Sequence, residues 1–227
     1  MSAVFVTATG TDIGKTFLTC GLIRQARATR RAVDAIKPVL TGFSQANLQA
    51  SDPGMLLSAL ARPVTMQEIE RVSPWRFSAP ISPHLAAARE QGRIDFAQVA
   101  EHCRAAIAEC RGLLLIEGIG GIMVPLDDRH TVLDLMSVLR VPALLATGSY
   151  VGTLSHTFTA LEVLARRNVD VPAVVVVETP GCASSLDDTV NTLAQFAAPL
   201  DIVALPRLPP DATEHPAFAQ ILALISP

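Results

Sequence analysis

Short apolar segments alternate with longer amphipathic segments along most of the chain. The short segments are aliphatic throughout rather than at every second position, which is typical of strands covered on both faces of a parallel sheet. We predict strands at residues 3–7, 33–37, 113–117, 143–147, 173–177 and 202–205. We predict helices at residues 16–29, 94–109, 132–139, 155–167, 186–196 and 216–224. Such repeated strand–helix–strand units predict an α/β fold, doubly wound, with a mainly parallel sheet and helices on both faces.

The stretch from residue 41 to residue 83 interrupts this alternation. It is rich in Ser, Pro and Gln, and we expect only one short helix in it, near Met55–Leu60. Long excursions between strands often carry functional residues. A chain of 227 residues suits one large α/β domain or at most two small ones, and we take residues 1–227 as a single domain.

Polar or glycine-rich segments follow the predicted strands. They are residues 7–14, 37–42, 117–121, 148–152 and 178–181. Ligands of open parallel sheets bind beyond the carboxyl ends of the strands. We therefore expect these segments to gather along one edge of the sheet and to form the functional site.

Composition narrows the possible partners. Half of the residues are hydrophobic and 17% are charged, which argues against disorder. The formal net charge is −3, so no strong field would draw the protein onto nucleic acid or an anionic membrane. No apolar segment is long enough to span a bilayer, and no signal peptide is recognisable. We expect a cytoplasmic protein without nucleic-acid or membrane partners, in which any phosphate is held by a local site.

The four cysteines, Cys20, Cys103, Cys110 and Cys182, form no CxxC pair, and no histidine lies at metal-finger spacing from them. We expect reduced, mostly buried thiols. A disulfide between Cys103 and Cys110 is the alternative, although it would bridge two turns of a predicted helix.

The strongest motif is ATGTDIGKT at residues 8–16, which follows an apolar strand and opens a helix. This is the context of a phosphate-binding loop. Gly14 lets the backbone turn so that successive N–H groups meet phosphate oxygens, and the helix start adds its positive dipole end. Lys15 can reach the β- and γ-phosphates, and the Thr16 hydroxyl can ligate Mg²⁺.

The spacing of this loop departs from GxxxxGK[ST], which would place a glycine at position 9. Thr9 stands there instead, and Gly10 is one residue too close. A glycine turn that merely links strand and helix is the alternative. The GKT triplet in this context favours nucleotide binding.

Two further strands end in a charged residue. LLLIEGIGG at residues 113–121 is an apolar strand ending in Glu117, a pattern that can hold Mg²⁺ opposite a phosphate-binding loop. Lys37 follows another predicted strand and would point at the same crevice as Lys15, which suits an anion besides the nucleotide. For Glu117 and Lys37 the alternative is a solvated residue at a strand end. Asp52 is either the N-cap of a helix or a further metal ligand.

The run GSYVGTLSH at residues 148–156 ends a strand and opens a helix. A helix start rich in glycine and hydroxyl residues can hold a carboxylate or a phosphate. The alternative is that Thr153 or Ser155 only caps the helix. His156 is as compatible with a helix surface as with a ligand.

In this order, these segments resemble the dethiobiotin synthetase family over residues 2–210. The resemblance rests on FVTATGTDIGKT, IKPVLTG, Ser51-Asp52, RFSAPISPH, LLLIEGIGGIMVPL and GSYVGTLSHT. It implies a P-loop NTPase-like fold and a homodimer with sites at the interface. It also implies that 7,8-diaminopelargonate, CO2 and ATP with Mg²⁺ yield dethiobiotin, ADP and phosphate. One amine captures CO2 as a carbamate, the carbamate attacks the γ-phosphoryl group, and the second amine displaces phosphate to close the ureido ring.

The resemblance also implies roles for individual residues. Catalysis falls to Lys37, Lys15 and Thr11. Mg²⁺ would be held by Thr16, Asp52 and Glu117. The nucleotide would contact Gly10, Thr11, Asp12, Ile13, Gly14, Lys15, Thr16, Phe17, Glu117, Gly120, Glu178 and Pro206. The substrate would contact Thr41 and Lys37 and, with its carboxylate tail, Gly152, Thr153, Leu154 and Ser155 of a neighbouring subunit.

Four positions depart from the family pattern. Ala8 replaces the first glycine of the loop, and Thr41 stands where a serine is common. Ser155 replaces a common asparagine at the position implied for the substrate tail. Glu178 lies near the point where the family often reads adenine with an asparagine.

Three rival functions fit the sequence less well. A partitioning or positioning ATPase carries a second lysine at position 10, where this chain has Gly10. The synthetase of a cobyrinate-type amidotransferase needs an attached glutaminase, and too few residues follow Leu205 to form one. A small-molecule kinase does not account for the KPVLTG and SPH segments.

Overall fold

The structure, a computed structural model, describes residues 2–208 and 214–225. Its main sheet has six strands, all parallel, in the order β2–β5–β1–β6–β7–β8. These strands are β1 Ser2–Ala8, β2 Val33–Ile36, β5 Leu113–Glu117, β6 Ala143–Gly148, β7 Ala173–Val177 and β8 Asp201–Leu205. Each predicted strand is present, with its ends within one residue of the expected position. The predicted doubly wound parallel fold is confirmed.

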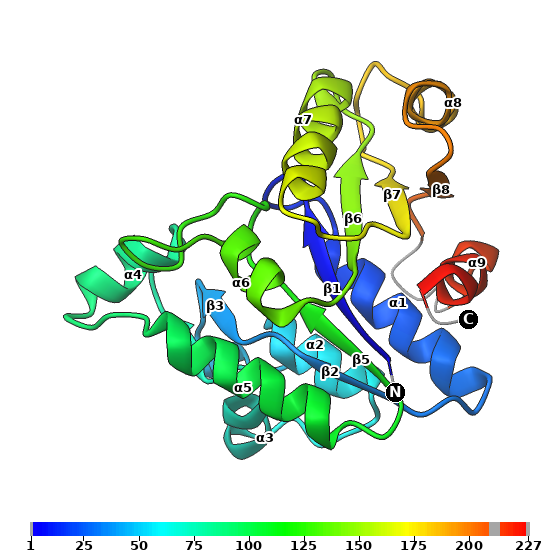
Figure 1. Ribbon diagram of the computed structural model, residues 1–227. Helices are drawn as coiled ribbons and strands as arrows, with labels where there is room; N and C mark the ends of the chain where they lie inside the picture. The colour runs from blue at the N-terminus through cyan, green and yellow to red at the C-terminus, as the bar shows by residue number, and fades with distance from the viewer. Residues whose placement is uncertain (1, 209–213, 226–227) are drawn as a thin grey trace.

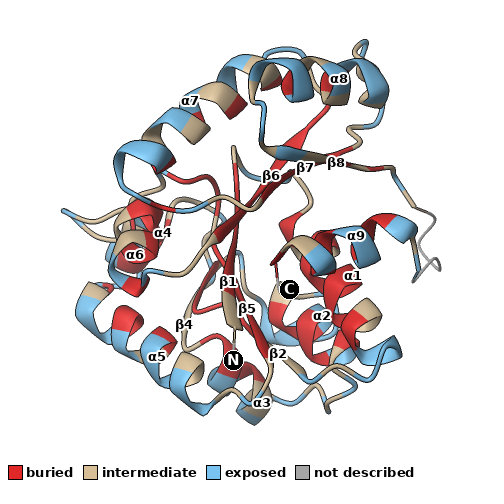
Figure 2. Ribbon diagram, turned by 45° about the vertical axis from the view of Figure 1, so that its right-hand side comes forward, coloured by how far each residue is buried: buried red, intermediate tan, exposed pale blue. Residues whose placement is uncertain are grey.

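Helices cover both faces of this sheet (Figures 1 and 2). One face carries α1 Lys15–Ala28, α2 Asp52–Ala59 and α9 Pro216–Ile225. The other carries α5 Phe96–Glu109, α6 Val132–Leu139, α7 Thr153–Arg166 and α8 Leu186–Phe196. Successive side chains of a strand point to opposite faces, so Val4 and Val6 join one core cluster while Phe5 joins the other. The continuous apolar pattern of the strands follows from this two-sided cover.

Helix α9 packs closely on α1 (Figure 1). The ring of Phe218 lies directly over Gly21, where a Cβ atom would come within 2.2 Å of it. Phe218 is 1% exposed and also meets Phe17 edge-on, with ring centroids 6.0 Å apart. A glycine at position 21 is therefore required for this helix contact.

The excursion after β2 contains more structure than the sequence indicated. It holds β3 Val39–Thr41, β4 Trp75–Phe77, a 3₁₀ turn Gln45–Asn47, α3 Met66–Val72 and α4 Pro83–Arg89 besides α2. We expected one short helix here, near residues 55–60, and this was wrong because α3 and α4 are also present. The expected helix corresponds to α2, which starts earlier, at Asp52. Strands β3 and β4 pair in parallel as a small second sheet, with Thr41 opposite Phe77. Three-residue strands and seven-residue helices are too short for a hydrophobic period to reveal.

All four cysteines are free thiols, so the alternative disulfide between Cys103 and Cys110 is not formed. Burial raises the pKa of both Cys20 and Cys103 to about 12, with the Glu117 carboxylate adding to the effect at Cys20. Cys110 and Cys182 are half-buried. Within the described residues, no helix is both long and apolar enough to cross a membrane.

Candidate active site

The register of two strands places Lys37 beside Glu117. Ile36 of β2 lies opposite Ile116 of β5, so the next residue of each strand meets the other at the carboxyl edge. The Lys37 Nζ atom lies 2.7 Å from Glu117 Oε1 and donates to the Gly118 carbonyl at 3.2 Å. The two side chains are 4% and 0% exposed. Neither residue is a solvated strand end, so those alternatives were wrong.

Asp52 is part of the same cluster. Its Oδ2 atom lies 3.1 Å from Lys37 Nζ, and its side chain is 36% exposed. Asp52 is the first residue of α2, and the N-cap is Ser51, whose hydroxyl accepts from the Gly54 amide at 3.3 Å. The N-cap alternative for Asp52 was therefore wrong by one residue. This leaves the Asp52 carboxylate free to face the crevice.

The phosphate-binding loop joins this cluster through Thr16. Gly14, with φ 104°, lies in the left-handed region at the N-cap of α1, where any other residue would be strained. The next two residues point in different directions. Lys15 Nζ donates to the Gly10 carbonyl at 3.1 Å, and the Thr16 hydroxyl donates to Glu117 Oε1 at 2.7 Å.

Burial and the neighbouring charges act differently on the two lysines. Burial and, next, repulsion by Lys37 lower the pKa of Lys15 to about 8, against the pull of Glu117 and Asp52. Burial also disfavours charge on Lys37, but Glu117 and Asp52 outweigh it and raise the pKa of Lys37 above its ordinary value. Lys37 is therefore a fixed cation, whereas the charge of Lys15 depends on pH near neutrality.

A cavity of about 490 Å³ gathers most of the predicted site. It is lined by Thr11, Asp12, Gly14, Lys15, Thr16, Phe17, Lys37, Leu40, Thr41, Asp52, Pro80, Ile119 and Gly120. We call it the phosphate cavity. The predictions missed Leu40, Pro80 and Ile119. Pro80 follows β4 in the SAPISPH segment, whose two prolines and serines were a usable signal of a shaped loop.

The oxygen donors in this cavity, together with Glu117 directly behind Thr16 and Lys37, fit Mg²⁺. The Glu117 Oε2 atom is buried without a hydrogen-bond partner, whereas Oε1 serves both Thr16 and Lys37. With the Asp52 carboxylate and the Thr16 hydroxyl, it completes a set of hard oxygen ligands. No group of three or more His, Cys, Asp or Glu residues that could hold a metal occurs in the described part of the chain. Mg²⁺ would therefore also need phosphate oxygens and water, as is usual for this ion.

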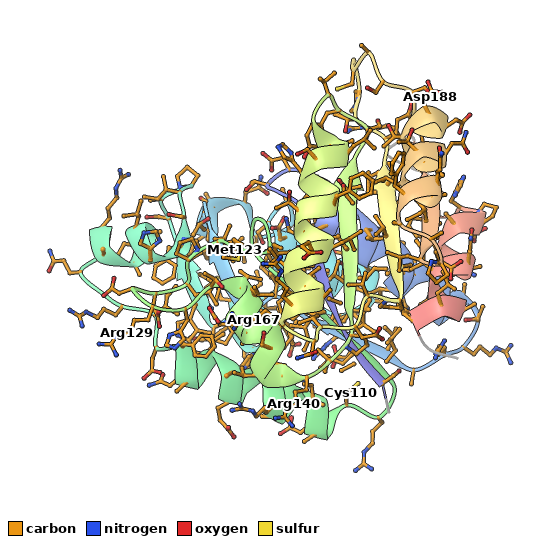
Figure 3. The ribbon with its side chains drawn as sticks, turned by 45° about the horizontal axis from the view of Figure 1, so that its top comes forward. Cys110, Met123, Arg129, Arg140, Arg167 and Asp188 are labelled. Carbon is orange, nitrogen blue, oxygen red and sulfur yellow. The ribbon has the colours of Figure 1, made fainter. Side chains whose placement is uncertain are left out.

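A second cavity, of about 480 Å³, adjoins the first through Thr11, and we call it the α7 cavity. Its lining is Thr9, Gly10, Thr11, Gly121, Ile122, Met123, Val124, Pro125, His156, Thr159, Ala160 and Val163. Most of these side chains are apolar. Met123, 55% exposed, lies beside α7 (Figure 3). The cavity could hold an aliphatic chain that extends from the phosphate cavity.

The predicted tail site at the start of α7 does not line either of these two cavities. Gly152 is the N-cap with φ 98°, and no side chain caps the helix, so the capping alternative for Thr153 or Ser155 was wrong. The Thr153 hydroxyl is buried and donates to the Gly148 carbonyl at 2.6 Å, and its backbone N–H donates to the Tyr150 carbonyl at 3.1 Å, so both of its donors are already used within the protein. Leu154 and Ser155 are the other two residues of the predicted tail site, in the first turn of α7. His156 does line the α7 cavity, with its Nδ1 atom 2.9 Å from the Tyr150 hydroxyl.

Glu178 and Pro206 follow β7 and β8 and lie outside both cavities. These strands are paired with Val177 opposite Leu205. Glu178 Oε2 accepts from the Arg207 amide at 2.8 Å. Val177 lies 3.2 Å from the position of a Cβ atom on Gly14, which puts these strand ends beside the phosphate-binding loop.

Comparison with known proteins places the chain in a family. A family model described as an AAA domain matches residues 2–214. An ATP-dependent dethiobiotin synthetase BioD from Methylobacterium nodulans is 44% identical over 202 residues, 87% of this chain and 90% of that protein. The protein of the same name from Caulobacter vibrioides is 44% identical over 91% of this chain and 93% of its own length. The one from Phenylobacterium zucineum is 42% identical over 98% of this chain and 94% of its own length.

Solved structures with the same fold are much more distant in sequence. The septum site-determining protein MinD from Pyrococcus horikoshii, complexed with Mg-ADP, has a TM-score of 0.57 at 15% identity. It covers 99% of this chain and 96% of its own. The MinC:MinD complex from Aquifex aeolicus has a TM-score of 0.56 at 14% identity, with 92% of this chain and 82% of that one covered. At these identities, the likeness shows the fold alone.

Proposed function

Because the chain belongs to the ATP-dependent dethiobiotin synthetase family, we propose that Lys15, Lys37 and Thr11 carry out its ring closure in the phosphate cavity. The chain is an ATP-dependent ligase of biotin biosynthesis. Its proposed substrates are 7,8-diaminopelargonate, CO2 and ATP, and its products are dethiobiotin, ADP and phosphate. The observation that carries the assignment of residues is that two buried ammonium groups, Lys15 and Lys37, line one cavity.

Charge explains why this reaction needs two cations. One amine of the substrate adds CO2 and loses a proton, which yields a carbamate anion. A carbamate oxygen then attacks the γ-phosphorus, ADP leaves, and a carbamic–phosphoric anhydride forms. Two anions must approach each other in a site that excludes much water, where their repulsion is large. Lys37 holds the carbamate, and Lys15 holds the phosphates.

The second amine completes the ring. It attacks the carbonyl carbon of the anhydride, the C–O bond to phosphate breaks, and the amine gives up its proton. This step depends on holding the amine close to the carbon rather than on a protein nucleophile. Thr11 and Thr41 both line the phosphate cavity and would orient the two amines through their hydroxyls.

Mg²⁺ is the metal we propose for the site, with Thr16, Asp52 and Glu117 as its protein ligands. When bound, it would neutralise phosphate charge during transfer. The buried, unpartnered Oε2 atom of Glu117 supports this assignment. The nucleotide itself would contact the loop Gly10–Phe17 and Gly120, with Ile13 and Asp12 contributing backbone N–H groups. Glu178 and Pro206 would lie along the base.

We assign the aliphatic chain of the diamine to the α7 cavity, because Thr11 joins this largely apolar cavity to the phosphate cavity. Its carboxylate would meet the helix start Gly152–Ser155 of a second copy of the chain in a homodimer. We also propose a cytoplasmic enzyme, which the four free thiols support.

Ring closure can be tested with purified protein, MgATP, ¹⁴C-bicarbonate and 7,8-diaminopelargonate. We expect acid-stable label in the product only when the diamine is present. Lys37→Ala should lose most of this label, whereas Arg166→Ala, which removes an exposed cation on α7, should keep it. ATP hydrolysis without label in a product would refute ring closure and favour an ATPase switch.

A further inference from the structure

Four threonine hydroxyls connect the phosphate-binding loop to helix α7. Ala8 of β1 lies opposite Ala146 of β6, so the next residues, Thr9 and Thr147, come together just beyond the paired strands. The Thr147 hydroxyl lies 3.1 Å from that of Thr9 and 2.8 Å from those of both Thr153 and Thr157. Thr147, Thr153 and Thr157 are almost fully buried, at 0%, 2% and 0% exposure.

Counting hydrogens fixes the direction of these bonds. Thr153 donates to the Gly148 carbonyl at 2.6 Å, and Thr157 donates to the Thr153 carbonyl at 2.7 Å. Each of these hydroxyls has one hydrogen, so both can only accept from Thr147. Thr147 must then share its own hydrogen between them, and Thr9 must be the donor to Thr147. The chain of donors therefore runs from the phosphate-binding loop through Thr147 to α7.

This chain of hydroxyls joins two segments that line the α7 cavity. One is the loop segment Thr9, Gly10 and Thr11. The other belongs to α7 and includes His156 and Thr159, on either side of the buried Thr157. Thr147 is the shared anchor, because it contacts both the loop and the first two turns of α7. Thr147 therefore ties these two segments of the cavity lining to each other.

We propose that Thr147 is a positioning residue for the diamine, which holds the α7 cavity at the width that fits its aliphatic chain. The proposal rests on the function proposed above, because it assigns the diamine to that cavity. The phosphates would be unaffected, since Gly14, Lys15 and Thr16 are proposed to hold them in the phosphate cavity, whereas the Thr147 hydroxyl bonds to Thr9, Thr153 and Thr157. Loss of the Thr147 hydroxyl should therefore weaken binding of the diamine and leave binding of ATP unchanged.

The variant Thr147→Val tests the role of the hydroxyl with little change of shape. It strands no buried donor, because Thr153 and Thr157 keep their carbonyl partners and Thr9 is only half-buried. We expect the KM of the diamine to rise about fivefold, because α7 is no longer held to the loop through Thr147, with kcat and the KM of ATP within about twofold of the wild type. Thr147→Ser keeps the hydroxyl and should restore the wild-type KM.

Thr189→Val is a matched control. Thr189 is also buried, at 4%, and donates to a carbonyl four residues earlier, Ser185, but it lies on α8 away from both cavities. Its kinetics should equal those of the wild type. Thr9→Val removes the donor at the other end of the chain of hydroxyls and should raise the same KM. The double variant of Thr9 and Thr147 should add nothing to the effect of Thr147→Val, because Thr147→Val already breaks the bond between these two hydroxyls.

Each outcome separates the two proposals. If the wild type forms labelled product but Thr147→Val keeps the diamine KM within about twofold, the positioning role is wrong and the proposed function stands. The same conclusion follows if Thr147→Ser behaves like Thr147→Val, or if the effects of Thr9→Val and Thr147→Val add. If the wild type forms no labelled product, the proposed function fails and the positioning role fails with it. The dissociation constant of the diamine, measured calorimetrically for each variant, should follow its KM.

Discussion

The ion pair between Lys37 and Glu117 makes a sharp prediction for stability. Lys37→Met keeps the length of the side chain and removes its charge, which leaves Glu117, at 0% exposure, without its ion-pair partner. Removing one partner of a buried ion pair costs about 3–5 kcal/mol of unfolding free energy. The second pair, with Asp52, adds about 0–1 kcal/mol, because the Asp52 carboxylate is 36% exposed and partly screened by solvent. We therefore expect a loss of about 3 kcal/mol or more at pH 8.

The loss of unfolding free energy in Lys37→Met should be larger at high pH than at low pH. The pKa of Lys37 is raised in the folded protein, so its contribution to the wild type is complete below the ordinary lysine value and is lost only as the pH rises above it. The contribution of the Lys37 charge to the wild type is therefore constant between pH 5 and pH 8. In Lys37→Met, the stranded Glu117 carboxylate favours a proton in the folded state, which stabilises the fold at low pH. The variant should lose less at pH 5 than at pH 8.

Urea unfolding at both pH values, followed by circular dichroism, would measure these differences. The double variant Lys37→Met with Glu117→Gln removes both charges and should recover much of the loss. Arg166→Met, which removes an exposed i,i+4 pair with Glu162, is the control and should change stability by less than about 0.5 kcal/mol. A loss below about 1 kcal/mol at pH 8, or one that is equal at both pH values, would refute this account of the cluster.

Three further predictions follow from the site and the thiols. The pKa of Lys15 is lowered to about 8, and a bound phosphate would raise it again. ATP binding should therefore take up a proton and weaken as the pH rises above about 8. Calorimetry in buffers of different ionisation enthalpy would detect the proton uptake. Glu178→Gln should shift the ratio of affinities for GTP and ATP by about fivefold in favour of ATP in competition binding. The reason is that the carboxylate of Glu178 can only accept hydrogen bonds from a base, whereas the amide of glutamine can also donate one. Cys20 and Cys103, whose pKa is raised to about 12, should resist N-ethylmaleimide longer than the two half-buried thiols, as mass spectrometry of labelled peptides would show.

The buried sheet could be predicted because its signal is continuous. Strands such as Leu113–Glu117 are covered on both faces, so every residue up to the final acid is apolar and the boundaries are visible in the sequence. The excursion after β2 gives no such signal. Val39–Thr41 and Trp75–Phe77 are each three residues long and become strands only by pairing with each other. Tertiary pairing of this kind cannot be read from a local pattern.

Most residues that line the phosphate cavity could be predicted from the sequence, but their contacts could not. GKT and the strand-end acid identified Thr16 and Glu117, yet the sequence left Lys37 between a solvated end and a site cation. The register of β2 against β5, which buries Lys37 on Glu117, decided between them. For Asp52, the decision depended on a helix boundary one residue away, which is finer than a sequence pattern resolves. The threonine hydroxyls around Thr147 gave no signal, because a buried threonine resembles any other strand residue.

The contact between Phe218 and Gly21 has a consequence for biosynthesis. Helix α1 carries Lys15 at its first position, yet the helix that covers its outer face, α9, comes after every strand of the sheet in the sequence. Without α9, the apolar face of α1 around Gly21 would lose its cover. A growing chain therefore buries this face of α1 only once α9 has been made.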